Sequence, residues 1–148
     1  MNIFGKTIDE IRQLITNLNL RSYTANQIVK WMYSKHVRDF DSMTDISKQN
    51  RKLLKDSFEI KCLSPIDMQT SKDGTKKYLF KTEKGYFIKS VLIPSDSRTT
   101  VCVSTQAGCA WGCKFCMTGQ QGFQGNLETG EILSQVVGIP EYQEVNRV

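Results

Sequence analysis

Apolar positions near the start of the chain recur every three or four residues, which is the spacing of one face of an α-helix. Ile8, Ile11, Ile15 and Leu18 follow this period. Thr7 precedes them and Glu10 lies three residues after Thr7, which is the order of a capping box at a helix start. The pattern therefore predicts a helix that is capped by Thr7.

Two further helices are predicted before residue 60. A second capping-box pattern at residues 24–27 opens a helix that carries Trp31 and Met32 on its apolar face. Ser47 is placed to cap a third helix, whose few apolar residues stand among lysines and an arginine. We therefore expect residues 5–60 to form a small helical bundle, with Trp31 and Met32 in its core.

The period changes from 3.6 to 2 after the helical segment, which indicates strands. Turn residues at 71–74 and 83–85 bound an alternating strand at 76–82, and residues 86–93 form the return strand of a β-hairpin. Alternation places Lys89 on the same face as three apolar neighbours. Such a lysine either extends its ammonium into water or marks a polar site, and the residues alone favour the first explanation.

A strand, a loop and a helix are expected next, in that order. Residues 99–104 form the strand, residues 106–126 are rich in Gly, Gln and Cys, and residues 127–138 have the apolar pattern of a helix that Pro140 stops. Residues 146–148 look like the start of another strand. In α/β proteins the loop after a strand lies at the ligand-binding edge of the sheet.

Composition and charge exclude several classes of protein. The 148 residues are 39% hydrophobic and 24% charged, which is typical of a soluble globular protein and not of a collagen-like or disordered chain. No apolar run approaches the roughly 20 residues of a membrane-spanning helix. The N-terminus has no secretory signal pattern, so we expect a cytoplasmic protein that has no membrane association.

The net charge of +5 is concentrated in the first segment. Residues 1–62 contain eleven basic and seven acidic residues, whereas residues 63–148 contain nine and eight. A basic surplus of this size is compatible with RNA as a partner. From charge alone, however, a solvated helical surface is the simpler explanation.

Three of the five cysteines fall within eight residues. Cys109, Cys113 and Cys116 have the spacing C-x3-C-x2-C, while Cys62 and Cys102 stand apart. In a chain without a secretory signal, clustered cysteines indicate metal ligands or catalysts before disulfides. Such thiolates can hold a zinc ion or an iron–sulfur cluster, and three ligands would leave one iron of a [4Fe–4S] cluster open.

This loop and its flanks resemble the RlmN/Cfr family of radical S-adenosylmethionine RNA adenine methyltransferases. An aromatic residue, Phe115, precedes the last cysteine, as in radical S-adenosylmethionine enzymes generally. The flank Gln120-Gln121-Gly122-Phe123 is similar to that of the RlmN/Cfr family in particular, as are Trp31-Met32-Tyr33 and Asp73-Gly74-Thr75 upstream. The resemblance covers about residues 8–138.

The resemblance implies an α/β architecture in two parts. Residues 1–62 would form a small helical domain of an RNA-binding type. Residues 63–148 would form a β-hairpin extension and then the first unit of a truncated radical-S-adenosylmethionine (β/α) partial barrel. Implied partners are rRNA, tRNA for some members, and an electron donor for the cluster. The oligomeric state stays open.

The resemblance also implies a chemistry for these cysteines. Cys109, Cys113 and Cys116 would hold a [4Fe–4S] cluster, and its open iron would bind S-adenosylmethionine, with Phe115 near the adenine. Members methylate carbon 2 of an adenine in 23S rRNA through a methylated cysteine, and Cfr-type members modify carbon 8. By itself a lone cysteine in such a strand would be a small buried side chain. Because the flanks of Cys102 match the family, the resemblance implies that it is the catalytic thiol that resolves the enzyme–RNA crosslink. Cys62 is expected to be structural.

The sequence departs from the family pattern in two ways. Lys89 stands where members usually carry a proton-accepting glutamate, and a protonated lysine cannot accept a proton. The family's remaining cofactor segments and its methyl-carrying cysteine would lie beyond residue 148. We therefore expect no methyl transfer by this chain alone, and poor stability.

Two alternatives remain open at this stage. One is an RNA-binding remnant of the family that has lost catalysis. The other is a zinc-binding module that uses Cys102 with the three clustered cysteines.

Overall fold

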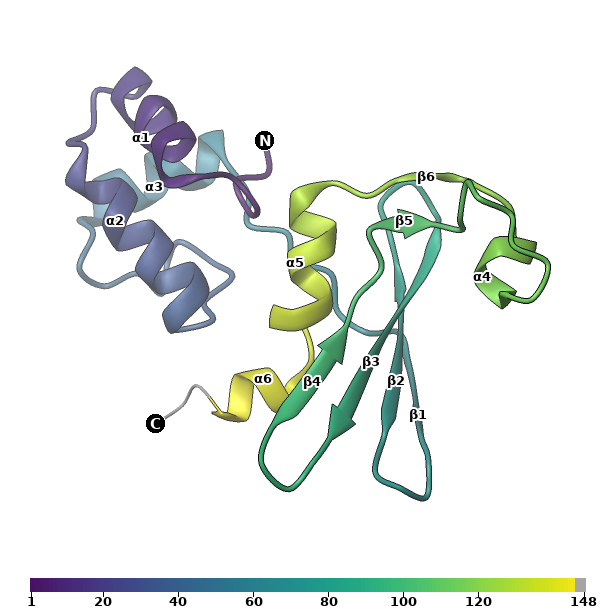
Figure 1. The fold of residues 1–148 in the computed structure, drawn as a ribbon. Coiled ribbons are helices and arrows are strands. Elements are labelled where there is room, and N and C mark those ends of the chain that lie inside the picture. Colours follow the sequence, from purple (N-terminus) through teal and green to yellow (C-terminus); the bar gives the residue numbers. More distant parts are fainter. Residues whose placement is uncertain (146–148) are drawn as a thin grey trace. The chain divides into compact units, whose positions relative to one another are not determined.

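The computed structural model describes residues 1–145, which form two compact units (Figure 1). Unit 1 comprises residues 1–62 together with the segment that begins at Glu141, and unit 2 comprises Leu63–Pro140. No helix in residues 1–145 is long and apolar enough to cross a membrane. The strand predicted at 146–148 lies outside the described residues.

Unit 1 is helical, as the apolar period predicted. Its helices are α1 (Ile8–Asn17), α2 (Tyr23–Val29), the π-helix η1 (Lys30–Ser34) and α3 (Lys48–Ser57). The Thr7 hydroxyl accepts a hydrogen bond from the backbone N–H of Glu10, and the Glu10 carboxylate accepts one from the N–H of Thr7 at 2.7 Å. The Ser47 hydroxyl accepts a hydrogen bond from the N–H of Asn50. The predicted caps of the first and third helices are therefore confirmed.

The second predicted capping box is wrong. The helix begins one residue earlier, at Tyr23, and its N-cap Ser22 makes no side-chain capping bond. Thr24 lies inside the first turn and is buried, so tertiary packing determines this helix start. The helix then continues into η1, which carries Trp31 and Met32, so the second predicted helix is divided between α2 and η1.

The core of unit 1 consists of the apolar residues of the helical period and of the connecting segments. Its fully buried members include Ile3, Ile11, Ile15, Ile28, Met32, Met43 and Leu54. Trp31 differs from the prediction, because it is only half-buried. Its indole N–H donates to Asp45 Oδ1 at 2.6 Å, and Lys35 Nζ lies 3.4 Å from the ring centroid. The indole therefore makes both a hydrogen bond and a cation–π contact.

Unit 2 is built on a four-stranded antiparallel sheet in the order β1-β2-β3-β4 (Figure 1). The strands are β1 (Asp67–Thr70), β2 (Lys76–Lys81), β3 (Phe87–Pro94) and β4 (Thr99–Cys102). The predicted hairpin is β2–β3, within a residue of the expected bounds, whereas β1 was not predicted. All four residues of β1 are exposed and they lack an apolar alternation, so the sequence carries no strand signal there.

The strand before the cysteine loop belongs to the same sheet as the hairpin. β4 pairs antiparallel with β3, with Cys102 opposite Val91. The strand that the sequence predicted to open the barrel unit is thus also hydrogen-bonded to the hairpin. The connection between β3 and β4 is a tight turn in which Ser95 N–H donates to Arg98 O at 3.0 Å. Such a turn joins antiparallel strands, because parallel strands need a crossover of a dozen or more residues.

One face of the sheet is buried and the other is exposed. Tyr78, Phe80, Ile88 and Leu92 are on the buried face, where α5 (Thr129–Val137) lies against β3. Lys89 shares the opposite face with Phe87 and Ile93, which are both exposed. The apolar face assigned to Lys89 from the pattern is therefore the solvent-facing one, and the ammonium extends into water.

Short elements complete unit 2. They are β5 (Gln106–Ala107), α4 (Met117–Gln120) and β6 (Gly125–Asn126). The predicted helix corresponds to α5, which ends at Val137. Pro140, the last residue of unit 2, then opens a further helix, α6 (Pro140–Val145), whose other residues are counted in unit 1. Its fixed φ and missing N–H suit a first helical position.

Candidate functional site

The cysteine loop of unit 2 is closed at its base by β5 and β6. β5 and β6 pair antiparallel, with Gln106 opposite Asn126, and the two side-chain amides are joined by a hydrogen bond of 2.9 Å. Gln124 N–H also donates to Ala107 O at 2.9 Å. The segment between them is therefore a closed loop whose ends are held together by backbone and side-chain bonds.

Two glycines let the backbone of this loop pack closely on itself. Gly108 has a φ of +73°, and a Cβ atom there would lie 1.6 Å from the carbonyl oxygen of Gly122. A Cβ atom on Gly119 would lie 2.7 Å from the backbone nitrogen of Cys113. No other residue fits at either position without moving backbone, so these glycines define the path of the loop.

The three predicted metal ligands all lie on this loop. Cys109, Cys113 and Cys116 are half-buried, and none of them forms a disulfide. Cys116 immediately precedes α4 and occupies its N-cap position. The backbone N–H groups of Gly119 and Thr118 lower the pKa of the Cys116 thiol and favour the thiolate, which is the form that binds metals.

The three cysteines lie on one closed loop, but their side chains do not point toward a common centre. Within residues 1–145, no three Cys, His, Asp or Glu side chains gather as a group that could hold a metal ion. The donor set itself suits an iron–sulfur cluster, since it consists of three unbridged thiols, one of which favours the thiolate.

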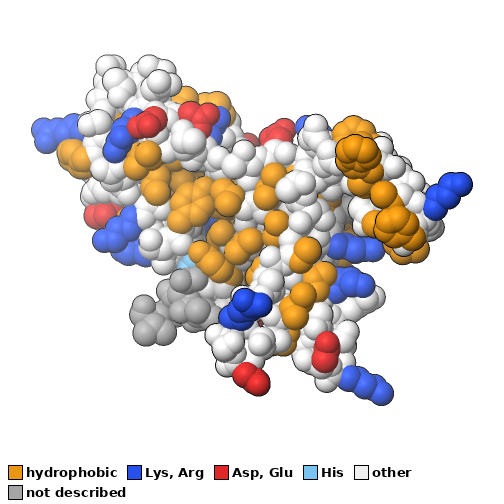
Figure 2. Space-filling view, viewed as in Figure 1, with side chains coloured by type: hydrophobic (Ala, Val, Ile, Leu, Met, Phe, Trp, Pro, Cys, Tyr) orange, Lys and Arg blue, Asp and Glu red, His pale blue; other side chains and the backbone are white. Residues whose placement is uncertain are grey.

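Large apolar side chains surround the thiols and point into solvent. Trp111 is 88% exposed and Phe115 is 92% exposed, and Met117 and Phe123 are exposed as well. Figure 2 shows orange side chains gathered over the part of unit 2 that carries α4. An aromatic ring as open as that of Phe115 is available to stack on a flat ligand.

The other two cysteines are placed differently. Cys102 is the last residue of β4 and is exposed, so it is not the small buried side chain that its strand position alone suggested. It lies opposite Val91, which is two residues from Lys89 on the same face. Cys62 belongs to unit 1 and is half-buried.

Lys89 borders a shallow pocket on the exposed face of the sheet. The pocket has a volume of about 110 Å³ and its lining includes Asp67 and Lys77. Its charged side chains are of both signs, so nothing in this pocket selects one charge of ligand.

A buried glutamine that the sequence analysis did not single out fixes the entry to the loop. Gln135 on α5 is fully buried, and its side-chain oxygen accepts a hydrogen bond from Ser104 N–H at 2.8 Å. Its side-chain nitrogen donates to Ser104 O at 2.7 Å. In the sequence, Gln135 is a polar residue within the apolar pattern of the predicted helix. Periodicity alone does not show whether such a residue is buried or faces solvent.

Comparison with known proteins shows what the chain resembles. Residues 1–60 match the family model "Ribosomal RNA large subunit methyltransferase N-terminal domain". A protein of *Phocaeicola vulgatus* named "Probable dual-specificity RNA methyltransferase RlmN" is 44% identical over 146 residues, which are 99% of this chain. The chain is therefore similar to RlmN proteins over almost its whole length.

Two further relatives extend this similarity. The RlmN protein of *Thermotoga neapolitana* is 47% identical over 139 residues, covering 93% of this chain and 40% of that protein. The crystal structure of a radical SAM methyltransferase from *Sphaerobacter thermophilus* matches all of this chain and 44% of its own, with a TM-score of 0.86 and 37% identity. The chain spans 42% of the length of the *Phocaeicola* RlmN protein, so it represents less than half of such a protein.

Proposed function

We propose that this chain contributes an RNA-binding helical domain and a cluster-binding loop to a radical S-adenosylmethionine enzyme. The enzyme would methylate carbon 2 of an adenine in 23S rRNA, and of a tRNA adenine as a second substrate. The observation that carries the proposal is the C-x3-C-x2-C motif on one closed loop, with the Cys116 thiolate favoured by two backbone N–H groups.

In this proposal residues 63–148 provide the catalytic segment. Cys109, Cys113 and Cys116 would hold a [4Fe–4S] cluster. When bound, the cluster would supply the electron that cleaves S-adenosylmethionine, so an external electron donor is required. The support is chemical, because three unbridged thiols lie on a loop that glycines hold in a fixed path.

Two other residues have proposed roles beside the thiols. Phe115 would stack on the adenine of S-adenosylmethionine, for which its 92% exposed ring is available. Cys102 would act as the thiol that releases the methylated RNA from the enzyme, and its exposure at the end of β4 makes it accessible to such a crosslink. Residues 1–62 would bind RNA, in keeping with their surplus of basic residues.

Metal content after anaerobic reconstitution with iron and sulfide, with zinc assayed in parallel, tests this proposal. The expected result is about four irons and four sulfides per chain. The variants Cys109→Ala, Cys113→Ala and Cys116→Ala should each lose most of the iron, whereas the control Cys62→Ala should keep it. Stoichiometric zinc that also depends on Cys102 would contradict the proposal and support a zinc-binding module.

One observation favours a second candidate function, an RNA-binding protein without catalysis. Lys89 lies on the exposed face of the sheet, two residues from Val91, which is paired with Cys102. It stands where family members usually carry a proton-accepting glutamate, and a protonated lysine cannot accept a proton. RNA binding that survives replacement of all three loop cysteines, in a chain that takes up no iron, would support this candidate.

A further inference from the structure

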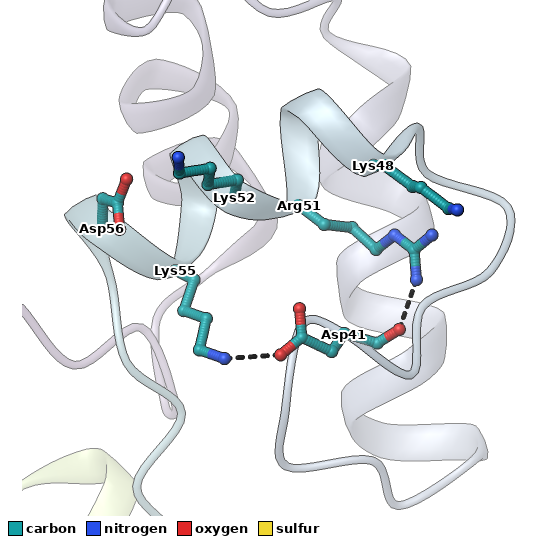
Figure 3. Close-up of a pocket in the computed structure, with 6 residues that line it drawn as sticks. All are labelled: Asp41, Lys48, Arg51, Lys52, Lys55 and Asp56. Atoms are coloured by element: carbon teal, nitrogen blue, oxygen red, sulfur yellow. Dashed lines mark hydrogen bonds and ion pairs between the residues drawn. The ribbon is translucent and has the colours of Figure 1, made fainter.

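Four basic side chains occupy one face of α3. Lys48, Arg51, Lys52 and Lys55 follow the spacing i, i+3, i+4 and i+7, which places them on one side of a helix. We call these four residues the α3 basic stripe. Figure 3 shows them around a pocket of about 530 Å³, which Asp41 and Asp56 also line.

The acidic residues of the pocket neutralise only part of this charge. Lys55 Nζ lies 2.5 Å from Asp41 Oδ2, and Arg51 donates a hydrogen bond to the backbone oxygen of Asp41 (Figure 3). Within the described chain, Lys48 and Lys52 form no ion pair. Arg51 Nε is shielded from solvent and has no hydrogen-bond partner among the described residues.

The first residue of the stripe is unfavourably placed for the helix itself, whereas Lys55 lies in the last turn, where a cation is favourable. Lys48 is the first residue of α3, and the first turn contains no acidic residue. Cations near a helix N-terminus oppose the helix dipole, whereas anions there are stabilising. A lysine at the first position of α3 therefore does not stabilise the helix. An external anion bound beside Lys48 would offset this unfavourable charge.

We propose that the α3 basic stripe binds consecutive phosphates of an RNA backbone. This inference rests on the proposed RNA substrate and assigns to it a contact surface separate from the cysteine loop. Seven residues of helix span about 10 Å, which is long enough to face more than one backbone phosphate. Contacts to phosphates position RNA without reading its sequence, so the stripe would bind many RNAs with similar affinity.

Asp41 would act as an internal competitor for the RNA. Its carboxylate holds Lys55, and its hydrogen bond raises the pKa of that ammonium. A phosphate that takes the place of this carboxylate would meet a fully protonated lysine. Replacing Asp41 with Asn frees Lys55 while the backbone oxygen that Arg51 contacts remains.

The test is fluorescence anisotropy with the 148-residue chain, prepared without iron, and a labelled RNA hairpin of 23S rRNA sequence, over a range of salt concentrations. Lys48→Glu and Lys52→Glu should each weaken binding about tenfold or more. Each should also lower the slope of log affinity against log salt by about 1, because a protein–phosphate contact is lost. Asp41→Asn should tighten binding severalfold.

A matched control separates the stripe from net charge. Lys72 lies in an exposed turn of unit 2 and forms no ion pair among residues 1–145, so Lys72→Glu makes the same charge change elsewhere. It should leave affinity within about twofold of the unchanged chain. Equal losses for Lys72→Glu and Lys48→Glu would overturn the assignment, as would equal binding of poly-glutamate, which carries carboxylates but no phosphates.

Thermal unfolding of the same variants guards against misfolding. Lys48→Glu should melt at or above the temperature of the unchanged chain, because an acidic residue suits the first turn of α3. A variant that is more stable and yet binds RNA less well supports a direct contact. Unchanged RNA binding by Lys48→Glu and Lys52→Glu would refute it. Because these assays use no iron, failure of cluster binding leaves their result unaffected, and the two proposals can fail separately.

Discussion

Gln135 on α5 pairs with Ser104 through both backbone polar groups of that residue, at 2.8 Å to its nitrogen and 2.7 Å to its oxygen. The Ser104 hydroxyl in turn donates to Lys89 O on β3 at 2.8 Å. One buried amide therefore ties the end of β4 to a helix, at the point where the chain enters the cysteine loop. The thiols of the loop are positioned from this fixed start.

Replacing Gln135 with Met should destabilise unit 2 by about 2–4 kcal/mol. The variant keeps the side-chain volume but leaves the N–H and C=O of the half-buried Ser104 without their Gln135 partner, at about 1–3 kcal/mol for each group left unsatisfied. Urea unfolding measures the change, and amide exchange at Ser104 should accelerate. The exposed Gln121→Met is the control and should change stability by less than about 0.5 kcal/mol. A Gln135→Met chain as stable as the unchanged protein would show that this pairing is not a structural tie.

Replacing Gly108 with Ala should disrupt the loop much more than the same change at Gly112. Both glycines have positive φ angles, so both substitutions carry a similar backbone cost of about 1–2 kcal/mol. Only at Gly108 would the new methyl group meet a backbone oxygen, since nothing lies within 4 Å of a Cβ atom on Gly112. Amide exchange across residues 106–126 should report a rearranged loop in Gly108→Ala alone. Similar exchange in the two variants would contradict the close approach of Gly108 to Gly122.

Alkylation of Cys116 should persist to a lower pH than that of an ordinary thiol. Backbone N–H groups of Gly119 and Thr118 lower the pKa of the Cys116 thiol, and the thiolate is the reacting form. The rate should level off above this pKa and fall about tenfold per pH unit below it. Mass spectrometry of the iodoacetamide-labelled peptide gives the profile. The urea-unfolded chain is the control, with a midpoint near the ordinary value of about 8.5. Coincident folded and unfolded profiles would exclude these hydrogen bonds.

Removing the cap of α1 should cost unit 1 about 1 kcal/mol at neutral pH. Thr7→Ala loses the hydroxyl that accepts from Glu10 N–H, which is the typical loss for an N-cap. The Thr7 backbone N–H and, to a smaller extent, its hydroxyl donate to the Glu10 carboxylate and lower the pKa of that carboxyl. Thr7→Ala removes only the hydroxyl, whose contribution to stability is present above the unfolded pKa of about 4.3. That part is lost as the pH falls through the lower, folded pKa. Chemical unfolding at pH 7 and pH 3 should therefore show a smaller effect of Thr7→Ala at the lower pH, and an equal effect at both would contradict this account of the cap.

Features set by neighbours in sequence were the ones that could be predicted. The caps at Thr7 and Ser47 and the β2–β3 hairpin follow from residues a few positions apart, and they match the structure. β1 could not be predicted, because its exposed polar residues form a strand only beside β2. The start of α2 was wrong for a related reason, since burial of Thr24 overrides its capping tendency.

The candidate site shows the same division. The spacing of Cys109, Cys113 and Cys116 identified the loop, because a short motif carries its own chemistry. The role of Gln135 depends on a partner 31 residues away, and its burial becomes evident only once α5 lies against the sheet. The exposed position of Cys102 likewise follows from the register of β4 with β3.

The central claim is that the three loop thiols can form a radical S-adenosylmethionine site. Electron paramagnetic resonance of the reconstituted, reduced chain, recorded with and without S-adenosylmethionine, tests it most directly. The account predicts the signal of a reduced [4Fe–4S] cluster that changes when S-adenosylmethionine is added, and its loss in Cys116→Ala. A cluster signal that S-adenosylmethionine leaves unchanged, or no cluster signal at all, would contradict the claim.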